Sequence, residues 1–149
     1  VPTYYDEMDI SIPMTKLGHY AAVLGITRWI PSLAESDAIK YGTLSENEKD
    51  IYRAVFYQRT ATETMVDEVK AVKDNANIVK ENGIPQVPML LFISNGSGGT
   101  GFTKERWRSI PKEYISGHDN ASYIELDCPH YVHDYEYEAI SKGIRTFIK

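Results

Sequence analysis

The apolar residues in the first half of the chain recur at spacings that suit helices. Residues 15–30, TKLGHYAAVLGITRWI, have the apolar pattern of a largely buried helix. The residues that carry this pattern are Leu17, Tyr20, Ala21, Leu24 and Ile26. Residues 31–42, PSLAESDAIKYG, follow as a connector or a short helix. The pattern therefore predicts a helical region at the start of the chain.

Two further helices have marked beginnings. Ser45 with Glu48, and Thr60 with Glu63, both have the spacing of a capping box. The first helix is predicted through NEKDIYRAVFYQ and the second through TETMVDEVKAVKDNANIVKE. The second should stop at Asn82-Gly83, where glycine allows a left-handed cap.

The hydrophobic pattern changes in the second half of the chain. IPQVPMLLFIS is continuously apolar after Pro88, as expected of a strand buried on both faces. A helix-like stretch, TKERWRSIPKEYISG, follows and should be interrupted at Pro111. ASYIEL is the second predicted strand, and apolar residues then recur every three or four positions from Ala139 to Ile148. This order predicts an α/β fold, a parallel strand–helix–strand unit that carries a helical insertion.

Composition and charge exclude several classes of function. The 149 residues, with a net charge of −5, suffice for one domain and form no basic patch, so no nucleic-acid partner is expected. The longest apolar stretches are too short to cross a bilayer. A single cysteine, Cys128, excludes an internal disulfide and suits a reducing compartment, so a cytoplasmic location is expected. The chain opens on VPTYYDE and not on Met, so a leader or anchor could precede it.

A glycine-rich loop follows the first predicted strand. Gly96, Gly98 and Gly101 satisfy G-x-G-x-x-G, and Asp127 ends the next strand, where a dinucleotide fold keeps its ribose-binding acid. Two features disfavour a dinucleotide fold. The next helix opens with FTKERW and not with the small residues that pack closely on the strand, and little sequence remains to complete a nucleotide-binding sheet. A plain strand–helix loop is favoured, and a nucleotide-binding module is the alternative.

One histidine lies where chemistry is expected. His130 follows the second predicted strand and a short DCP turn, and a strand-end loop can hold an imidazole rigid while leaving it exposed. Two other uses of this segment are weaker. His130 and His133 lack a third metal ligand, so no metal is expected, and Cys128 should point away from His130. His19 and His118 have no chemical context.

The order strand, glycine-rich loop, helix, strand, turn, histidine and amphipathic helix resembles the last third of an α/β-hydrolase. DCPHYVHDYEYEAISKGIRTFI is similar to the segment in which this family carries its catalytic histidine. The resemblance implies that His130 is the general base, although Pro129 stands where glycine is common. It also implies an acid after the previous strand, but Asn95 occupies that position. Three explanations stay open: Asn95 orients the imidazole, Asp6 or Glu7 supplies the acid, or the hydrolase is weak or inactive.

The resemblance also implies that this chain is only part of an enzyme. It contains no G-x-S-x-G, so the serine nucleophile should lie upstream of Val1 and the chain alone should be inactive. Residues 1–7 would be the exit from a preceding strand, and residues 8–83 would form a helical cap. Residues 84–149 would form the C-terminal part of the hydrolase core, two parallel strands with flanking helices. A non-catalytic interaction domain is a further alternative.

The expected substrate is a small ester or amide, hydrolysed without a cofactor. Aromatic residues of the predicted cap could line an acyl pocket, although core packing would explain each of them equally well. These residues are Tyr20, Trp29, Tyr52 and Phe56. The two strands would leave an unpaired apolar edge, which predicts a homodimer or packing against another chain through that edge.

Overall fold

The computed structural model describes residues 1–98 and 100–149, which form two compact units. One unit comprises Val1–Met8 and Ala76–Lys149 and is called the sheet unit; the other comprises Asp9–Asn75 and is called the helical unit. The described residues contain one two-stranded parallel sheet together with helices, so the α/β class is confirmed.

The helical unit consists of short helices followed by two longer ones. The elements are α2 (Ile12–Val23), η1 (Ile26–Trp29), η2 (Pro31–Ala34), α3 (Asp37–Tyr41), α4 (Glu46–Arg59) and α5 (Glu63–Glu81). The elements η1 and η2 are 3₁₀ helices, and α5 continues into the sheet unit.

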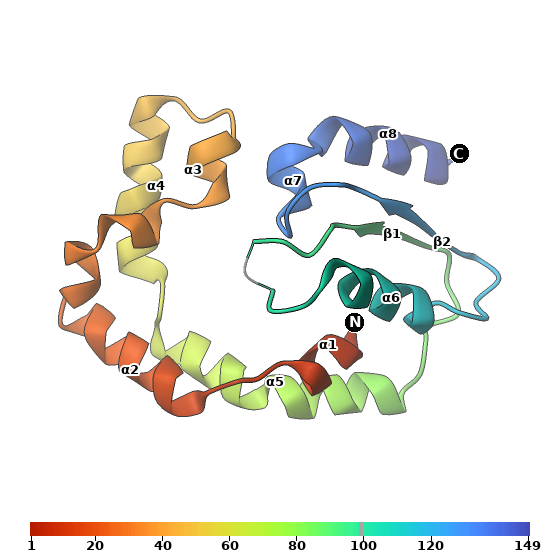
Figure 1. The fold of residues 1–149 in the computed structure, drawn as a ribbon, viewed down its shortest axis with the longest axis horizontal. Helices are drawn as coiled ribbons and strands as arrows, with labels where there is room; N and C mark the ends of the chain where they lie inside the picture. The colour runs from red at the N-terminus through yellow and green to blue at the C-terminus, as the bar shows by residue number, and fades with distance from the viewer. Residues whose placement is uncertain (99) are drawn as a thin grey trace. The chain divides into compact units, whose positions relative to one another are not determined.

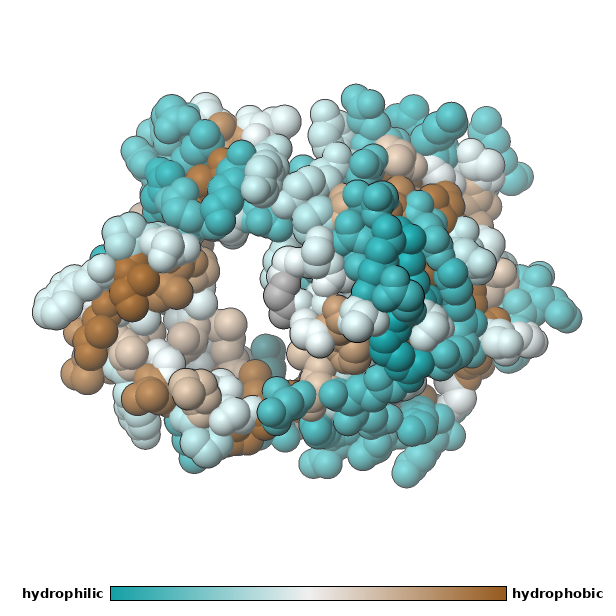
Figure 2. Space-filling view, in the orientation of Figure 1, coloured by the Kyte–Doolittle hydropathy of each residue, from teal (hydrophilic) through white to brown (hydrophobic). Residues whose placement is uncertain are grey.

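The helix predicted across residues 15–30 is shorter than expected, and its burial was predicted wrongly. Gly25 has a φ of +74°, and this left-handed turn separates α2 from η1. Leu17 and Leu24 are 60% and 73% exposed. An apolar patch lies over α2 (Figure 2). The spacing of the apolar residues indicated a helix, but it did not indicate whether another element packs over the apolar side of that helix.

One of the two predicted helix caps is confirmed and the other is wrong. Ser45 and Glu48 form the capping box, with the Ser45 N–H donating to Glu48 Oε2 at 2.8 Å. At the start of α5, however, the Met65 N–H donates to Thr62 Oγ1 at 3.3 Å, so Thr62 replaces the predicted Thr60. Ala61, with a φ of +57°, turns the chain between the two threonines. The predicted glycine stop is confirmed, since Gly83 has a φ of +71°.

The sheet unit places two parallel strands between helices (Figure 1). Strand β1 (Met89–Ile93) pairs with β2 (Ala121–Glu125), with Leu91 opposite Tyr123. The helices of this unit are α1 (Pro2–Glu7), α6 (Lys104–Tyr114), α7 (Val132–Tyr135) and α8 (Tyr137–Phe147). Residues 1–7, expected at the exit of a strand, thus contain a helix. Within β1 only Ile93 is fully buried, so the prediction of burial on both faces is wrong.

A glycine brings α8 close to the sheet. A Cβ atom added to Gly143 would lie 2.9 Å from the ring of Phe92 and 3.0 Å from Ile124 Cδ1. Phe92 and Ile124 are paired across the two strands and therefore share the face that α8 covers. The apolar side of α8 can therefore pack closely on the sheet because Gly143 has no side chain.

The predicted interruption at Pro111 is wrong, because α6 continues through it to Tyr114. Proline has no N–H, so the carbonyl of residue 107, four positions earlier, loses its usual donor. The Tyr4 hydroxyl donates to that Trp107 carbonyl at 2.7 Å. Burial raises the pKa of Tyr4 from 10.0 to about 12, so the hydroxyl stays a donor at a higher pH than an ordinary tyrosine would. A side chain from α1 thus supplies the bond that proline removes.

Replacing Tyr4 by Phe should lower the free energy of unfolding by about 1–2 kcal/mol, because the Trp107 carbonyl loses its partner. The measurement is urea unfolding of the wild-type and variant chains, followed by circular dichroism. Tyr5→Phe is the matched control, since Tyr5 is adjacent in α1 and 38% exposed. Equal effects of the two substitutions would contradict the role given to Tyr4.

Candidate functional site

The loops that follow β1 and β2 are bonded to each other at the carboxyl ends of the strands. The Asn95 N–H donates to the Cys128 carbonyl at 3.0 Å, and the His130 N–H donates to the Ser97 carbonyl at 3.0 Å. A Cβ atom added to Gly98 would lie 3.4 Å from Pro129 Cβ. The two segments predicted to carry the site therefore lie side by side.

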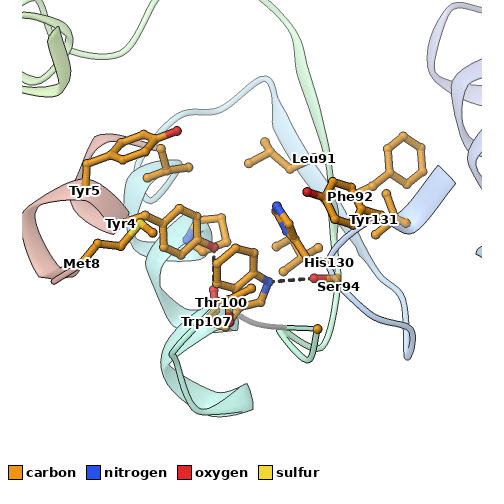
Figure 3. A pocket seen from close by; sticks show the side chains of 15 residues that line it. Tyr4, Tyr5, Met8, Leu91, Phe92, Ser94, Thr100, Trp107, His130 and Tyr131 are labelled. Atoms are coloured by element: carbon orange, nitrogen blue, oxygen red, sulfur yellow. Dashed lines mark hydrogen bonds between the residues drawn. The ribbon is translucent and has the colours of Figure 1, made fainter. Parts of the chain in front are cut away.

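The imidazole of His130 is exposed and rests against aromatic rings. Its ring meets the Trp107 indole edge-on, with the ring centroids 5.0 Å apart at an interplanar angle of 87°. Tyr131 lies on the other side, at a centroid distance of 5.2 Å (Figure 3). Within the described part of the chain, neither ring nitrogen of His130 hydrogen-bonds to another residue. Both nitrogens are therefore open to a proton donor or acceptor from outside these residues.

Trp107 is held rigidly beneath His130. Its indole Nε1–H donates to the buried Ser94 Oγ at 2.8 Å (Figure 3). The Gly96 N–H donates to the same oxygen at 3.2 Å. The Tyr4 ring stacks on the indole at a centroid distance of 4.3 Å. Sequence reasoning missed this support, because Tyr4, Ser94 and Trp107 come from three separate segments.

His130 faces a cavity of about 510 Å³ in the sheet unit. The wall is mainly apolar and aromatic, and its members include Tyr4, Met8, Leu91, Trp107, Tyr131 and Val132. The polar side chains in the wall are the hydroxyls of Ser94 and Thr100, those of the tyrosines, and the imidazole of His130. Among the described lining residues there is no charged side chain other than His130 when it is protonated. Such a wall suits an uncharged ligand.

The side chain of Asn95 is bonded within its own loop and to Asp127. Its Oδ1 accepts from the N–H and the hydroxyl of Ser97, at 3.0 Å and 2.7 Å, and its Nδ2 donates to Asp127 Oδ1 at 3.3 Å. Lys104 Nζ also donates to Asp127, at 2.8 Å. These bonds, from Lys104 first and then Asn95, lower the pKa of Asp127, which is therefore an anion. Sequence reasoning did not foresee a carboxylate behind Asn95.

The two other candidate acids are engaged in ion pairs. Asp6 accepts from Lys80 Nζ at 3.0 Å, and Glu7 accepts from Arg106 Nε at 2.9 Å. The hydrogen bond from Arg106 lowers the pKa of Glu7. In the described residues, neither carboxylate is bonded to His130. The structure thus brings the His130 and Asn95 loops together, and it leaves Asp6 and Glu7 with other partners.

The predicted substrate-binding aromatic residues all belong to the helical unit. Tyr20 and Trp29 are 61% and 85% exposed, whereas Tyr52 and Phe56 are half-buried. The cavity beside His130 is lined by other aromatic residues, among them Tyr4 and Trp107. The tyrosine pair in VPTYY was the one sequence signal that could have pointed to them.

The remaining nucleophile and ligand candidates have structural contacts. Cys128 is buried, and burial raises the pKa of its thiol, which disfavours the reactive thiolate. His133 Nε2 lies 3.5 Å from Asp134 Oδ1. His19 Nδ1 hydrogen-bonds to the Ala61 carbonyl, and His118 Nε2 hydrogen-bonds to the Pro85 carbonyl. The described residues contain no cluster of three or more metal-ligating side chains.

In the glycine-rich loop, several backbone N–H groups donate hydrogen bonds to side chains of the same loop. Gly96, Gly98 and Gly101 have φ values of +78°, +91° and +79°, while Gly99 lies outside the described residues. The N–H groups of residues 96, 97 and 102 donate to side chains of Ser94, Asn95 and Thr100. A phosphate cradle needs such amides to be available. These bonds stabilise the loop at the end of β1, and they occupy the amides of residues 96, 97 and 102.

No protein-family model, curated protein or solved structure matches this chain. Among the described residues, no helix is long and apolar enough to cross a membrane.

Proposed function

We propose that this chain supplies the general base and part of the acyl pocket of an α/β-hydrolase that cleaves small esters or amides. The observation that carries the proposal is the position of His130. Its exposed imidazole faces an apolar cavity at the carboxyl ends of two parallel strands, beside the loop of Asn95. Sites in open α/β sheets form at this edge.

His130 would act as the proton carrier of the reaction. The imidazole accepts the hydroxyl proton of the nucleophile as its oxygen attacks the acyl carbon, and then gives that proton to the leaving group. Water repeats the sequence to release the acid. Because the chain lacks G-x-S-x-G, the hydroxyl and the oxyanion-binding amides would come from another polypeptide segment.

Asn95 would position the histidine through the backbone. It holds Ser97 through two hydrogen bonds, and the Ser97 carbonyl in turn accepts the His130 N–H. Asp127 places a negative charge against the Asn95 amide. In this proposal the asparagine fixes the loop that carries the imidazole, as an orienting group that bears no charge.

The cavity limits the class of substrate. About 510 Å³ accommodates a short acyl or aromatic group, and the wall offers an anion no positively charged side chain other than a protonated His130. Uncharged esters should therefore be preferred over acidic ones.

The test is hydrolysis of p-nitrophenyl esters by the complete polypeptide encoded by the reading frame that contains these residues. Acetate, butyrate and octanoate esters should be cleaved, p-nitrophenyl phosphate should not, and a serine-directed phosphonate should abolish the reaction. Residues 1–149 alone should react no faster than buffer. Absence of ester cleavage, or activity that survives the phosphonate, would contradict the proposal.

A further inference from the structure

Helix α2 turns an apolar side to the solvent. Leu17, Tyr20 and Leu24, with Met14 and Val23 beside them, are between 60% and 73% exposed (Figure 2). They are spaced three or four positions apart, so they lie on one side of the helix and form a continuous stripe. These five residues are called the α2 stripe. An exposed stripe of this kind marks a surface that binds something.

The opposite side of α2 already packs against its own unit. The half-buried residues of the helix on that side are Ile12, Thr15, His19 and Ala22. His19 Nδ1 hydrogen-bonds to the Ala61 carbonyl at 2.7 Å, which fixes the helix in this orientation. The packed side and the α2 stripe therefore lie on different faces of the helix, and only a surface from outside these residues can cover the stripe.

The spacing of the stripe suits a second helix of the same sequence. Positions 17, 20 and 24 follow the 3–4 repeat that forms the seam between two packed helices. In an antiparallel pair of copies related by a twofold axis, Leu17 lies against Tyr20 of the partner subunit, and Tyr20 lies against Leu17 of the partner subunit. Pro13 then lies level with Leu24 of the partner subunit. The stripe is therefore complementary to itself in this orientation.

The exposed area of the stripe is sufficient for a weak dimer. Tyr20 exposes roughly 100 Å² of its side chain. The four aliphatic side chains add roughly 100 Å² each. Two copies would together bury roughly 1,000 Å², the size from which protein interfaces become specific, so a micromolar dissociation constant is expected.

The charges favour a second copy over a lipid surface. Residues 10–34 contain no acidic residue, and their basic residues are Lys16 and Arg28. An anionic membrane surface normally binds clusters of about four to eight basic residues, and the net charge of −5 opposes such binding. In the antiparallel pair the two Lys16 side chains are separated by about 7–8 Å along the helices, whereas a parallel pair would place them level with each other.

We propose that two copies of this chain associate through the α2 stripe, with the two α2 helices antiparallel. No residue of the stripe lines the cavity beside His130. The association is therefore independent of the proposed function, and it uses a different surface from the sheet edge.

The test is sedimentation equilibrium of residues 1–149 from about 5 to 500 µM. The wild-type mass should rise with concentration from 16.9 kDa toward twice that value. Leu17→Glu and Tyr20→Lys should each weaken the dimer at least tenfold, because each places an unpaired charge in the seam. Ile51→Glu is the matched control, since Ile51 is 55% exposed on α4 of the same unit, and this variant should dimerise like the wild type. All variants should keep the wild-type circular dichroism.

A mixture of the Leu17→Glu and Tyr20→Lys variants tests the orientation. In an antiparallel pair the introduced carboxylate and ammonium meet, so the mixture should recover the dimer. In a parallel pair each position faces itself, and the mixture should stay monomeric. Three results would overturn the proposal: a monomeric wild-type chain at every concentration, a dimer that both variants retain, or no recovery in the mixture. A monomeric wild-type chain that floats with phosphatidylglycerol vesicles would assign the stripe to a lipid surface.

Discussion

Replacing His130 by Ala should lower kcat for ester hydrolysis by the complete polypeptide about 10³-fold or more, with KM changed little. General base catalysis contributes roughly 10²–10⁴-fold, and an alkoxide nucleophile does not form near neutral pH without it. The His130 ring is exposed, so its removal leaves no buried polar group unpaired. The loss should therefore appear in turnover and not in the fold.

His133→Ala is the matched control for this experiment. His133 lies three residues away and is exposed, and it contacts Asp134. It should keep wild-type activity within about a factor of two, and both variants should have wild-type circular dichroism. If the two variants lost activity equally, or if His130→Ala kept a third of it, His130 would not be the base.

Replacing Gly96 by Ala should destabilise the chain by about 2–6 kcal/mol. Gly96 has a φ of +78°, and an added Cβ atom would lie 2.6 Å from Trp107 Cγ. Backbone strain of about 1–3 kcal/mol then adds to overpacking of about 1–3 kcal/mol. The indole must shift, which breaks its hydrogen bond to Ser94 and removes the surface on which His130 rests. Urea unfolding followed by circular dichroism measures the loss.

Gly101→Ala separates the two causes. Gly101 has a φ of +79°, but an added Cβ atom would meet nothing within 4 Å in the described residues. Only the backbone strain applies, so a loss of about 1–3 kcal/mol is expected, without the added loss from overpacking. Equal losses at the two positions would show that packing of Trp107 against Gly96 contributes nothing.

Local signals in the sequence predicted the elements of the fold well. The Ser45–Glu48 capping box and the Gly83 stop depend on residues within one turn, and both are present. The apolar run at 89–93 and the strand at 121–125 pair in parallel, as the order of elements indicated. Such features depend on neighbours in the sequence, which is why pattern reasoning found them.

Contacts between distant segments were not predictable in the same way. Tyr4 and Trp107 are separated by 103 positions, and their bond lets α6 continue through Pro111. In a helix where no other donor bonds to the carbonyl four residues before it, a proline is expected to interrupt the helix. The Thr60 cap failed for a local reason, because the turn at Ala61 shifts the start of α5 to Thr62.

At the candidate site, too, local signals were predictable from the sequence and contacts between distant segments were not. The sequence placed His130 and Asn95 in the loops after the two strands, and the structure bonds those loops to each other. It could not show that Asn95 binds Asp127, because the two residues meet only through the strand register. Nor could it show that Tyr4 and Trp107 line the cavity, since their side chains converge from two helices.

A crystal structure of the complete polypeptide with a phosphonate bound covalently to its nucleophile tests the role of His130 directly. A ring nitrogen of His130 should lie within hydrogen-bonding distance, about 2.6–3.2 Å, of the phosphonylated oxygen. The phosphonate substituent should enter the cavity between Trp107 and Leu91. An adduct whose oxygen is bonded to a different base, with the His130 ring turned away from it, would show that His130 is not the general base.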